Sequence, residues 1–210
     1  MSSMVASTLR VAVVPRPTWF VSALFVVGGA GLVALAAQVS IPLPFTPVPI
    51  TGQTFAVLLV GASLGSLLGA TSLLLYLAIG LVGAPVYADG ASGWGVVSSA
   101  TGGYLVGFVV SAALVGWLAE RRWDRQLSSA LGAMLCGNVL IYGCGLVWLA
   151  HVLHTNLNTT LEYGLYPFVV GDLLKLYLAA VLLPAAWRLT GASTNGSGHR
   201  RPRPRPRRSR

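Results

Sequence analysis

The residues best suited to chemistry are one acidic and one basic side chain within an apolar segment, in the stretch Asp172-Leu-Leu-Lys175. Lys175 is the only lysine of the chain. Residues three apart share one face of a helix, so the two side chains lie together if the segment is helical. In a membrane such charges are costly and as a rule face a cavity, where they mark a functional site. We interpret the pair as the polar contact of a small ligand. The alternative is a pair that only neutralises itself and ties helices together.

Other polar side chains in apolar surroundings are weaker candidates. Gln53 is one, and Asn138 lies four residues before Tyr142 on one helical face. Each could contact a ligand or form an interhelical hydrogen bond, which is the commoner use. His151 and His154 are three residues apart, but a metal site would need a third ligand, so none is expected.

The elements that must position these residues are apolar. The chain has 210 residues, of which 55% are hydrophobic and 9% charged. Soluble domains carry roughly 25% charged residues, so a soluble monomer is excluded. Stretches of about 20 apolar residues cross a bilayer as a helix. Clear spans are predicted at 19–37, 100–119, 127–151 and 165–188.

The distribution of charge sets the number of crossings. Basic residues gather before residue 17, at 121–125 and from residue 188 onward. The positive-inside rule puts all three groups in the cytoplasm, so an even number of crossings separates the first two. The apolar segment 55–82 is therefore predicted to be two short helices, divided near Ser63–Ser66. The prediction is an all-α membrane protein with six transmembrane helices and both termini cytoplasmic.

This topology divides the chain into three parts. Residues 1–17 are a short cytoplasmic segment, 18–189 the transmembrane substrate-binding domain, and 190–210 a disordered Arg/Pro-rich cytoplasmic tail. The tail is expected to contact membrane lipids and not nucleic acid, because no aromatic residues alternate with its arginines. A cleaved signal peptide ending near 34–37 is the alternative for the first helix.

Two connections on the outer side are unusual. Residues 41–50 hold four prolines and apolar side chains, which predicts a stiff, non-helical lid folded onto the helices. A tight interfacial turn is the alternative. The glycine-rich connection that follows the second short helix leads into the next span and adds three candidate ligand contacts: Tyr87, Asp89 and Tyr104.

Several of these blocks resemble one known family. The block Gln38-Val-Ser-Ile-Pro-Leu-Pro-Phe-Thr-Pro-Val-Pro-Ile-Thr-Gly-Gln-Thr54 is similar to the signature of the BioY family, the biotin-capturing S-components of energy-coupling factor (ECF) transporters. Gly83-Ala-Pro-Val-Tyr87, Thr101-Gly-Gly-Tyr-Leu-Val-Gly-Phe108 and Gly171-Asp-Leu-Leu-Lys175 are similar too, in the same order. The resemblance covers roughly residues 20–189.

The resemblance implies a six-helix S-component fold in the cell membrane. It also implies capture of biotin from outside, in a pocket that the first and third connections close. The implied partners are a transmembrane coupling subunit and two cytoplasmic ATPases, with which the S-component associates before it topples in the membrane. Ala30-Gly-Leu-Val-Ala34 resembles the family's docking pattern, whose small residues let helices approach closely.

The resemblance also gives Asp172 and Lys175 the role of pocket residues. A carboxylate accepts hydrogen bonds from ureido N–H groups, whereas an ammonium meets either the ureido carbonyl or the valeryl carboxylate of biotin. The sequence leaves that choice open. Some members of the family have an arginine in the third connection, but residues 84–99 hold none here. Which group balances the charge of the biotin carboxylate is therefore open as well.

The same residues are also compatible with another kind of transport. A self-sufficient secondary biotin carrier would use Asp172 and Lys175 to couple transport to protons or charge. The chain lacks the P-loop pattern Gly-x-x-x-x-Gly-Lys, so any use of ATP must come from partners. An enzyme is not expected, because no Ser/His pair and no paired carboxylates fall at membrane depth. No cofactor is expected, since biotin would be the transported ligand.

Overall fold

The computed structural model describes residues 8–14 and 17–190, and this part of the chain is mostly helical. Four helices are long and apolar enough to cross a membrane: α2 (Trp19–Gln38), α6 (Gly102–Glu120), α7 (Leu127–Leu153) and α9 (Val169–Leu189). Two shorter apolar helices follow α2: α3 (Gln53–Leu64) and α4 (Ser66–Leu81). The four predicted spans are thus present, each within a few residues of its expected bounds.

The predicted division of segment 55–82 is confirmed. Gly65 separates α3 from α4 with a φ of +88°, a backbone conformation that glycine adopts without strain. The carboxylate of Glu120, at the end of α6, then accepts hydrogen bonds from the N–H (2.8 Å) and hydroxyl (3.1 Å) of Ser66. A negative charge at this point stabilises the start of α4.

The remaining elements are short: α1 (Leu9–Val13), β1 (Ser40–Ile41), β2 (Ile50–Thr51), η1 (Ala88–Gly90), α5 (Trp94–Val97) and α8 (Leu157–Gly164). The connection between α7 and α9 contains the short helix α8, which was not predicted from the sequence. Asn156 begins it, with its side-chain oxygen accepting a hydrogen bond from the N–H of Thr159 at 3.0 Å. The predicted disordered tail lies, apart from residue 190, outside the described residues.

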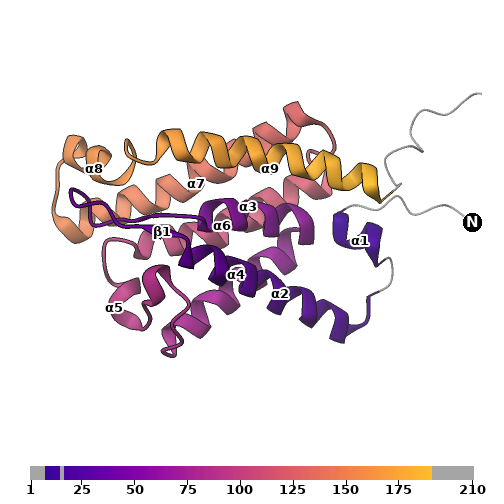
Figure 1. Cartoon of the computed structure of the whole chain (residues 1–210), viewed down its shortest axis with the longest axis horizontal. Helices are drawn as coiled ribbons and strands as arrows, with labels where there is room; N and C mark the ends of the chain where they lie inside the picture. Colours follow the sequence, from indigo (N-terminus) through magenta and orange to yellow (C-terminus); the bar gives the residue numbers. More distant parts are fainter. Residues whose placement is uncertain (1–7, 15–16, 191–210) are drawn as a thin grey trace, which may run out of the picture.

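The proline-rich connection 41–50 is a hairpin and not a helix, as predicted. β1 and β2 pair antiparallel, with Ser40 opposite Thr51 and Ile41 opposite Ile50. Figure 1 shows α6, α7 and α9 side by side and α2 packed across α3 and α4, with β1, α5 and α8 at one end of the bundle and α1 at the other. The hairpin, α5 and α8 therefore form a cap over one end.

α6 is the central helix, since it is the most buried of the four long ones. Small residues let α3 and α4 approach it closely. A Cβ added to Gly61 would lie 2.7 Å from the carbonyl oxygen of Ala112, and one added to Gly116 would overlap the backbone of Gly65 and Ser66. Such a seam is typical of helices that pack in lipid, where close contact replaces hydrophobic exclusion.

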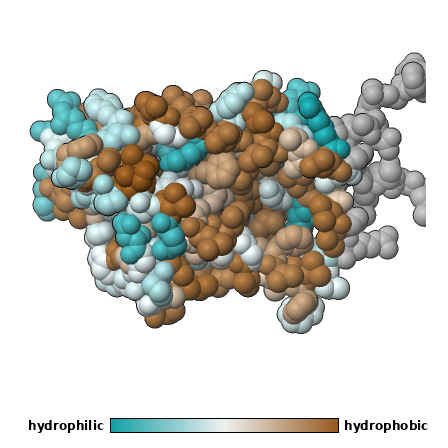
Figure 2. All heavy atoms as spheres, in the orientation of Figure 1, coloured by the Kyte–Doolittle hydropathy of each residue, from teal (hydrophilic) through white to brown (hydrophobic). Residues whose placement is uncertain are grey.

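The outer surface of the bundle is apolar. Large side chains such as Leu24, Leu35, Val147 and Val170 are more than half exposed. Figure 2 shows apolar residues over the middle of the molecule and most of the hydrophilic residues towards its two ends. This arrangement suits a body surrounded by lipid with its ends in water.

The end opposite the hairpin is closed by a contact between the α6–α7 turn and α9. Asp124 in the turn is 1% exposed, and its carboxylate accepts a hydrogen bond from the indole N–H of Trp187. The guanidinium of Arg125 lies 3.7 Å above the ring of Trp187, and its Nε is 4.0 Å from Asp124. Burial raises the pKa of Asp124 to about 6, although Trp187 and Arg125 oppose the shift.

This raised pKa predicts a pH-dependent effect of Asp124→Asn. Asp124 binds its proton more tightly in the folded chain, so its contribution to stability is greatest at low pH and is lost as the pH rises through about 6. Asparagine keeps an acceptor for Trp187 without a charge. The melting temperature of the variant, relative to that of the wild type, should therefore rise as the pH is raised from about 4 to 7.

The control is Asp89→Asn, which removes an exposed carboxylate at the other end of the bundle. Thermal unfolding in detergent across this pH range is the measurement. A constant difference between Asp124→Asn and the wild type at every pH would contradict the prediction.

Candidate functional site

A cavity lies beneath the hairpin at the capped end of the bundle. It is partly open to the outside, and the space between protein atoms amounts to about 620 Å³, including its open mouth. Its wall is mainly apolar and aromatic, with a few polar groups, as in most small-molecule sites. The residues that line it come from the hairpin, the 84–101 loop, α3, α6, α7 and α9, and include Val48, Thr51, Gln53, Thr54, Tyr87, Tyr104, Phe108, Ile141, Tyr142, Phe168, Asp172 and Lys175.

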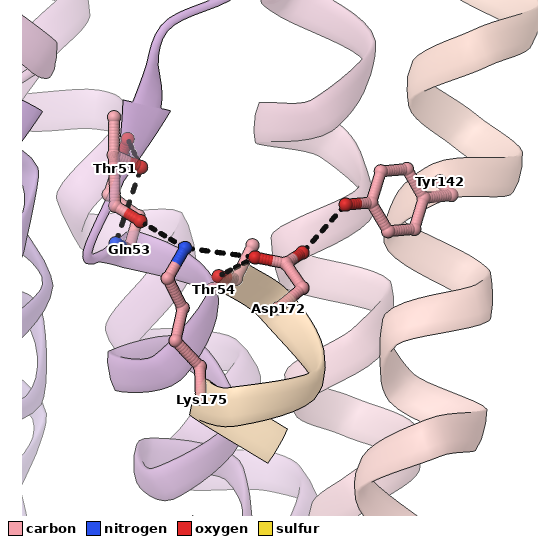
Figure 3. A network of polar contacts seen from close by, with 6 residues as sticks. All are labelled: Thr51, Gln53, Thr54, Tyr142, Asp172 and Lys175. Atoms are coloured by element: carbon pink, nitrogen blue, oxygen red, sulfur yellow. Dashed lines mark hydrogen bonds and ion pairs between the residues drawn. The ribbon is translucent and has the colours of Figure 1, made fainter. Parts of the chain in front are cut away.

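Asp172 is the acceptor at the centre of the polar wall. It lies in the first turn of α9 and is 4% exposed. Figure 3 shows its carboxylate between three partners from three elements. Oδ2 accepts a hydrogen bond from the hydroxyl of Tyr142 at 2.7 Å, and Oδ1 accepts from Thr54 at 3.4 Å and from Lys175 at 2.9 Å. The carboxylate therefore joins α9 to both α3 and α7.

Lys175 links this carboxylate to the hairpin. Its ammonium donates to Oδ1 of Asp172 and, at 2.7 Å, to the backbone carbonyl of Thr51 at the end of β2. An ammonium has three N–H donors, so one remains for a ligand. Because the opposite charges lie 2.9 Å apart, the pair carries no net charge into the cavity.

The aromatic walls are held by their own hydrogen bonds. Tyr104 donates to the carbonyl of Gly164 at 2.8 Å, and its ring meets that of Tyr142 edge-on at 6.3 Å. Gln53 donates to the hydroxyl of Tyr76 at 2.7 Å, behind the cavity wall. These contacts fix the rings before any ligand binds, which lowers the entropy lost on binding.

The loop 84–101 is anchored at several points. The hydroxyl of Tyr87 donates to the carbonyl of Leu77 at 2.8 Å, and its ring packs against Gly80, where no side chain would fit. Trp148 on α7 donates to the carbonyl of Ser99 at 2.9 Å. This loop therefore forms a fixed wall.

The tip of the hairpin is attached more lightly. The hydroxyl of Thr46 donates to the carbonyl of Tyr163 on α8 at 2.6 Å and accepts from the N–H of Val48 at 3.2 Å. Phe45, next to it, is 59% exposed. The hairpin is thus held at its base by Lys175 and at its tip by Thr46.

Most of the ligand contacts proposed from the sequence meet in this cavity, namely Gln53, Tyr87, Tyr104, Tyr142, Asp172 and Lys175. Asp89 does not line it, and it is exposed on η1. Asn138 is buried one turn below Tyr142 on α7, also outside the lining, and its Oδ1 has no hydrogen-bond partner among the described residues. Neither is in contact with the cavity.

The proposed docking residues lie mainly inside the bundle. Ala30 is 4% exposed in the core, and Ala34 is half-buried against that core. Leu24, Leu32 and Leu35 form the outward face of α2 instead. Docking through the two alanines stays a prediction, but their burial leaves little surface for a partner helix.

Two polar contacts were missed from the sequence. Nothing in the sequence singles out Thr54, which directly follows Gln53, except its place in the family signature. Thr51 contributes its backbone carbonyl, a group that every residue has, so its residue type gives no signal. Within the part that the structure describes, no three His, Cys, Asp or Glu side chains are grouped to hold a metal ion.

Comparisons with known proteins identify the family of the chain. The model of the BioY family matches residues 8–192. "Biotin transporter BioY" of Rhizobium etli is 36% identical over 159 residues, which cover 72% of this chain and 84% of that protein. The protein of the same name from Thermotoga maritima is 36% identical over 151 residues, covering 72% of this chain and 86% of its own length.

The fold has a solved counterpart. A crystal structure of the S-component for biotin from an ECF-type ABC transporter superposes with a TM-score of 0.74 at 24% identity. The match covers 82% of this chain and 95% of the other. At that identity the likeness supports the fold.

Proposed function

The chain belongs to the BioY family, and from that premise we propose that it captures biotin in the cavity beneath the hairpin and delivers it across the membrane. Membership makes it a multi-pass transport protein of the cell membrane and not an enzyme. The observation that carries the proposal is the Asp172–Lys175 pair in the wall of a mainly apolar cavity.

The chemistry of biotin suits this wall. Its ureido ring presents one carbonyl flanked by two N–H groups, and its thiophane ring is apolar. Lys175 keeps one N–H for a carbonyl, while Oδ2 of Asp172 carries one further lone pair for an N–H group. Because the pair is already neutral, it is better matched to a neutral urea than to a carboxylate. We therefore assign it to the ureido ring.

Calorimetric titration tests both statements. The wild type should bind both biotin and biotinamide, which lacks the carboxylate. Lys175→Met should lower the affinity for the two ligands by a similar factor. If Lys175→Met leaves the affinity for biotinamide unchanged, Lys175 contacts the carboxylate of biotin and not its ureido ring. Absence of biotin binding by the folded protein would overturn the proposed function.

The six apolar helices are proposed to cross the membrane with both termini in the cytoplasm, because the arginines that the structure describes, in α1, in the α6–α7 turn and at the end of α9, lie at the end opposite the cavity. The cavity then opens outward, towards the biotin supply. Reporter fusions at each terminus test this orientation. A reporter that is active only outside the cell would contradict it.

The partner is proposed to be an ECF coupling subunit with two ATPases. This assignment rests on the absence of a P-loop from the sequence and on the likeness to an S-component. Uptake of biotin by liposomes that hold the purified protein alone would favour the self-sufficient carrier instead. Uptake that requires the coupling module and ATP is the expected result.

Thr46→Val should speed the release of biotin. The substitution keeps the shape of the side chain but removes the hydrogen bond to Tyr163 that holds the hairpin tip. Losing one such bond costs about 0.5–1.5 kcal/mol, which corresponds to a dissociation rate about two- to tenfold higher. Stopped-flow displacement of labelled biotin measures this rate.

Thr46→Ser is the matched control, because it keeps the hydroxyl. It should release biotin at nearly the wild-type rate. If Val and Ser behave alike, the tip contact does not hold the hairpin closed.

A further inference from the structure

The α6–α7 turn, at the end opposite the cavity, carries two arginines that face outward. Arg121 and Arg122 are both exposed, directly after the last residue of α6. Arg122 has a φ of +70°, a left-handed conformation in which side chains are uncommon. The turn therefore presents two adjacent positive charges at one edge of the apolar bundle.

Among the residues that the structure describes, no carboxylate forms an ion pair with either arginine. The sequence holds five Asp and Glu residues, and only Glu120 and Asp124 lie at this end. Glu120 accepts the hydrogen bonds of Ser66, and Asp124 is buried against Trp187 beside Arg125. Each local acid thus has a contact within the fold, and the two exposed charges are available to an anion from outside.

The surroundings of the arginines are those of a membrane interface. Trp117, one turn before the end of α6, is 44% exposed, and Trp123 in the turn is 41% exposed. Such rings favour the headgroup level of a bilayer. The guanidinium of Arg121 lies 3.3 Å over the ring of Trp117, which holds the charge at that level. An anion at this depth would belong to a lipid.

We propose that Arg121 and Arg122 form a binding site for the phosphate of an anionic phospholipid, with Trp117 and Trp123 against the glycerol and upper acyl chains. Guanidinium groups bind phosphate oxygens in a bidentate manner, so two adjacent arginines give a specific site and not only a diffuse attraction. The site is independent of the biotin cavity.

The test is native mass spectrometry of the full chain, titrated in detergent with phosphatidylglycerol or phosphatidylcholine. The wild type should bind phosphatidylglycerol clearly more tightly. The double variant Arg121→Gln/Arg122→Gly should lose at least tenfold in this affinity, since even one charge-assisted hydrogen bond contributes about a factor of ten or more. Glycine also relieves the left-handed backbone at position 122, so the turn should still form.

Arg188→Gln is the control, since it removes one exposed charge at the same end of the bundle. Its affinity for phosphatidylglycerol should stay within about twofold of the wild type. Unchanged binding in the double variant would overturn the proposal. The proposal would also be overturned if Arg188→Gln lost as much affinity for phosphatidylglycerol per removed charge as the double variant, since that result indicates a diffuse effect of net charge.

Two further results would also overturn it. Glycerol phosphate that competes as strongly as the lipid would make this a site for free phosphate. If the double variant binds lipid normally but no longer co-purifies with a coupling subunit, the two arginines contact a protein partner and not a lipid.

Discussion

Replacing Asp172 with leucine is expected to lower the affinity for biotin by about ten- to a hundredfold, because the ligand loses a charge-assisted hydrogen bond, which contributes about 1.5–3 kcal/mol. The variant loses an acceptor for the ligand and also leaves Lys175 beside the cavity without its counter-charge. Tyr142 and Thr54 lose their acceptor as well. Calorimetric titration with biotin measures the loss, and thermal unfolding in detergent reports on the fold.

The double variant Asp172→Leu/Lys175→Met separates a ligand role from a structural one. Removing both charges together avoids the unpaired ammonium, so stability should recover relative to Asp172→Leu alone. Biotin binding should stay lost. If binding returns together with stability, the pair serves the fold and the ligand is held elsewhere.

Gly116→Ala is expected to lower the free energy of unfolding by about 2–3 kcal/mol, a large loss for one methyl group. A Cβ at this position would overlap the backbone atoms of Gly65 and Ser66, which cannot move aside as a flexible side chain could. The added carbon therefore separates α6 from the α3–α4 junction. Thermal and denaturant unfolding in detergent are the measurements.

Gly143→Ala is the control on α7. Nothing lies within 4 Å of a Cβ added there, and alanine favours a helix over glycine by about 1 kcal/mol. This variant should equal or exceed the wild type in stability. Equal losses in the two variants would mean that the seam at Gly116 is not specific.

The helices could be predicted because the bilayer imposes their length and leaves almost no room for charge. The break at Gly65 followed from counting crossings between groups of arginines. α8 could not be predicted in this way. It is too short to cross a membrane, and its start depends on one local bond from Asn156.

The polar pair of the site was predictable since charges are rare in such a sequence. The direction in which a residue faces was harder to predict. α2 is apolar on every side, so nothing in its sequence separates the face of Ala30 from the face of Leu32. Asn138 lies on the same face of α7 as Tyr142 but one turn below the cavity. Sequence periodicity predicts the face of a helix, but not how far along the helix a cavity extends.

The single lysine gives this protein a built-in chemical reporter. An amine-selective acylating reagent has two kinds of target in this chain, the amino terminus and Lys175. The ammonium of Lys175 is enclosed by Thr51 and Asp172 beneath the hairpin, with a side chain 20% exposed. Its acylation should therefore require the hairpin to lift. The labelling rate at this one peptide then measures how often the cavity opens, and bound biotin should slow it.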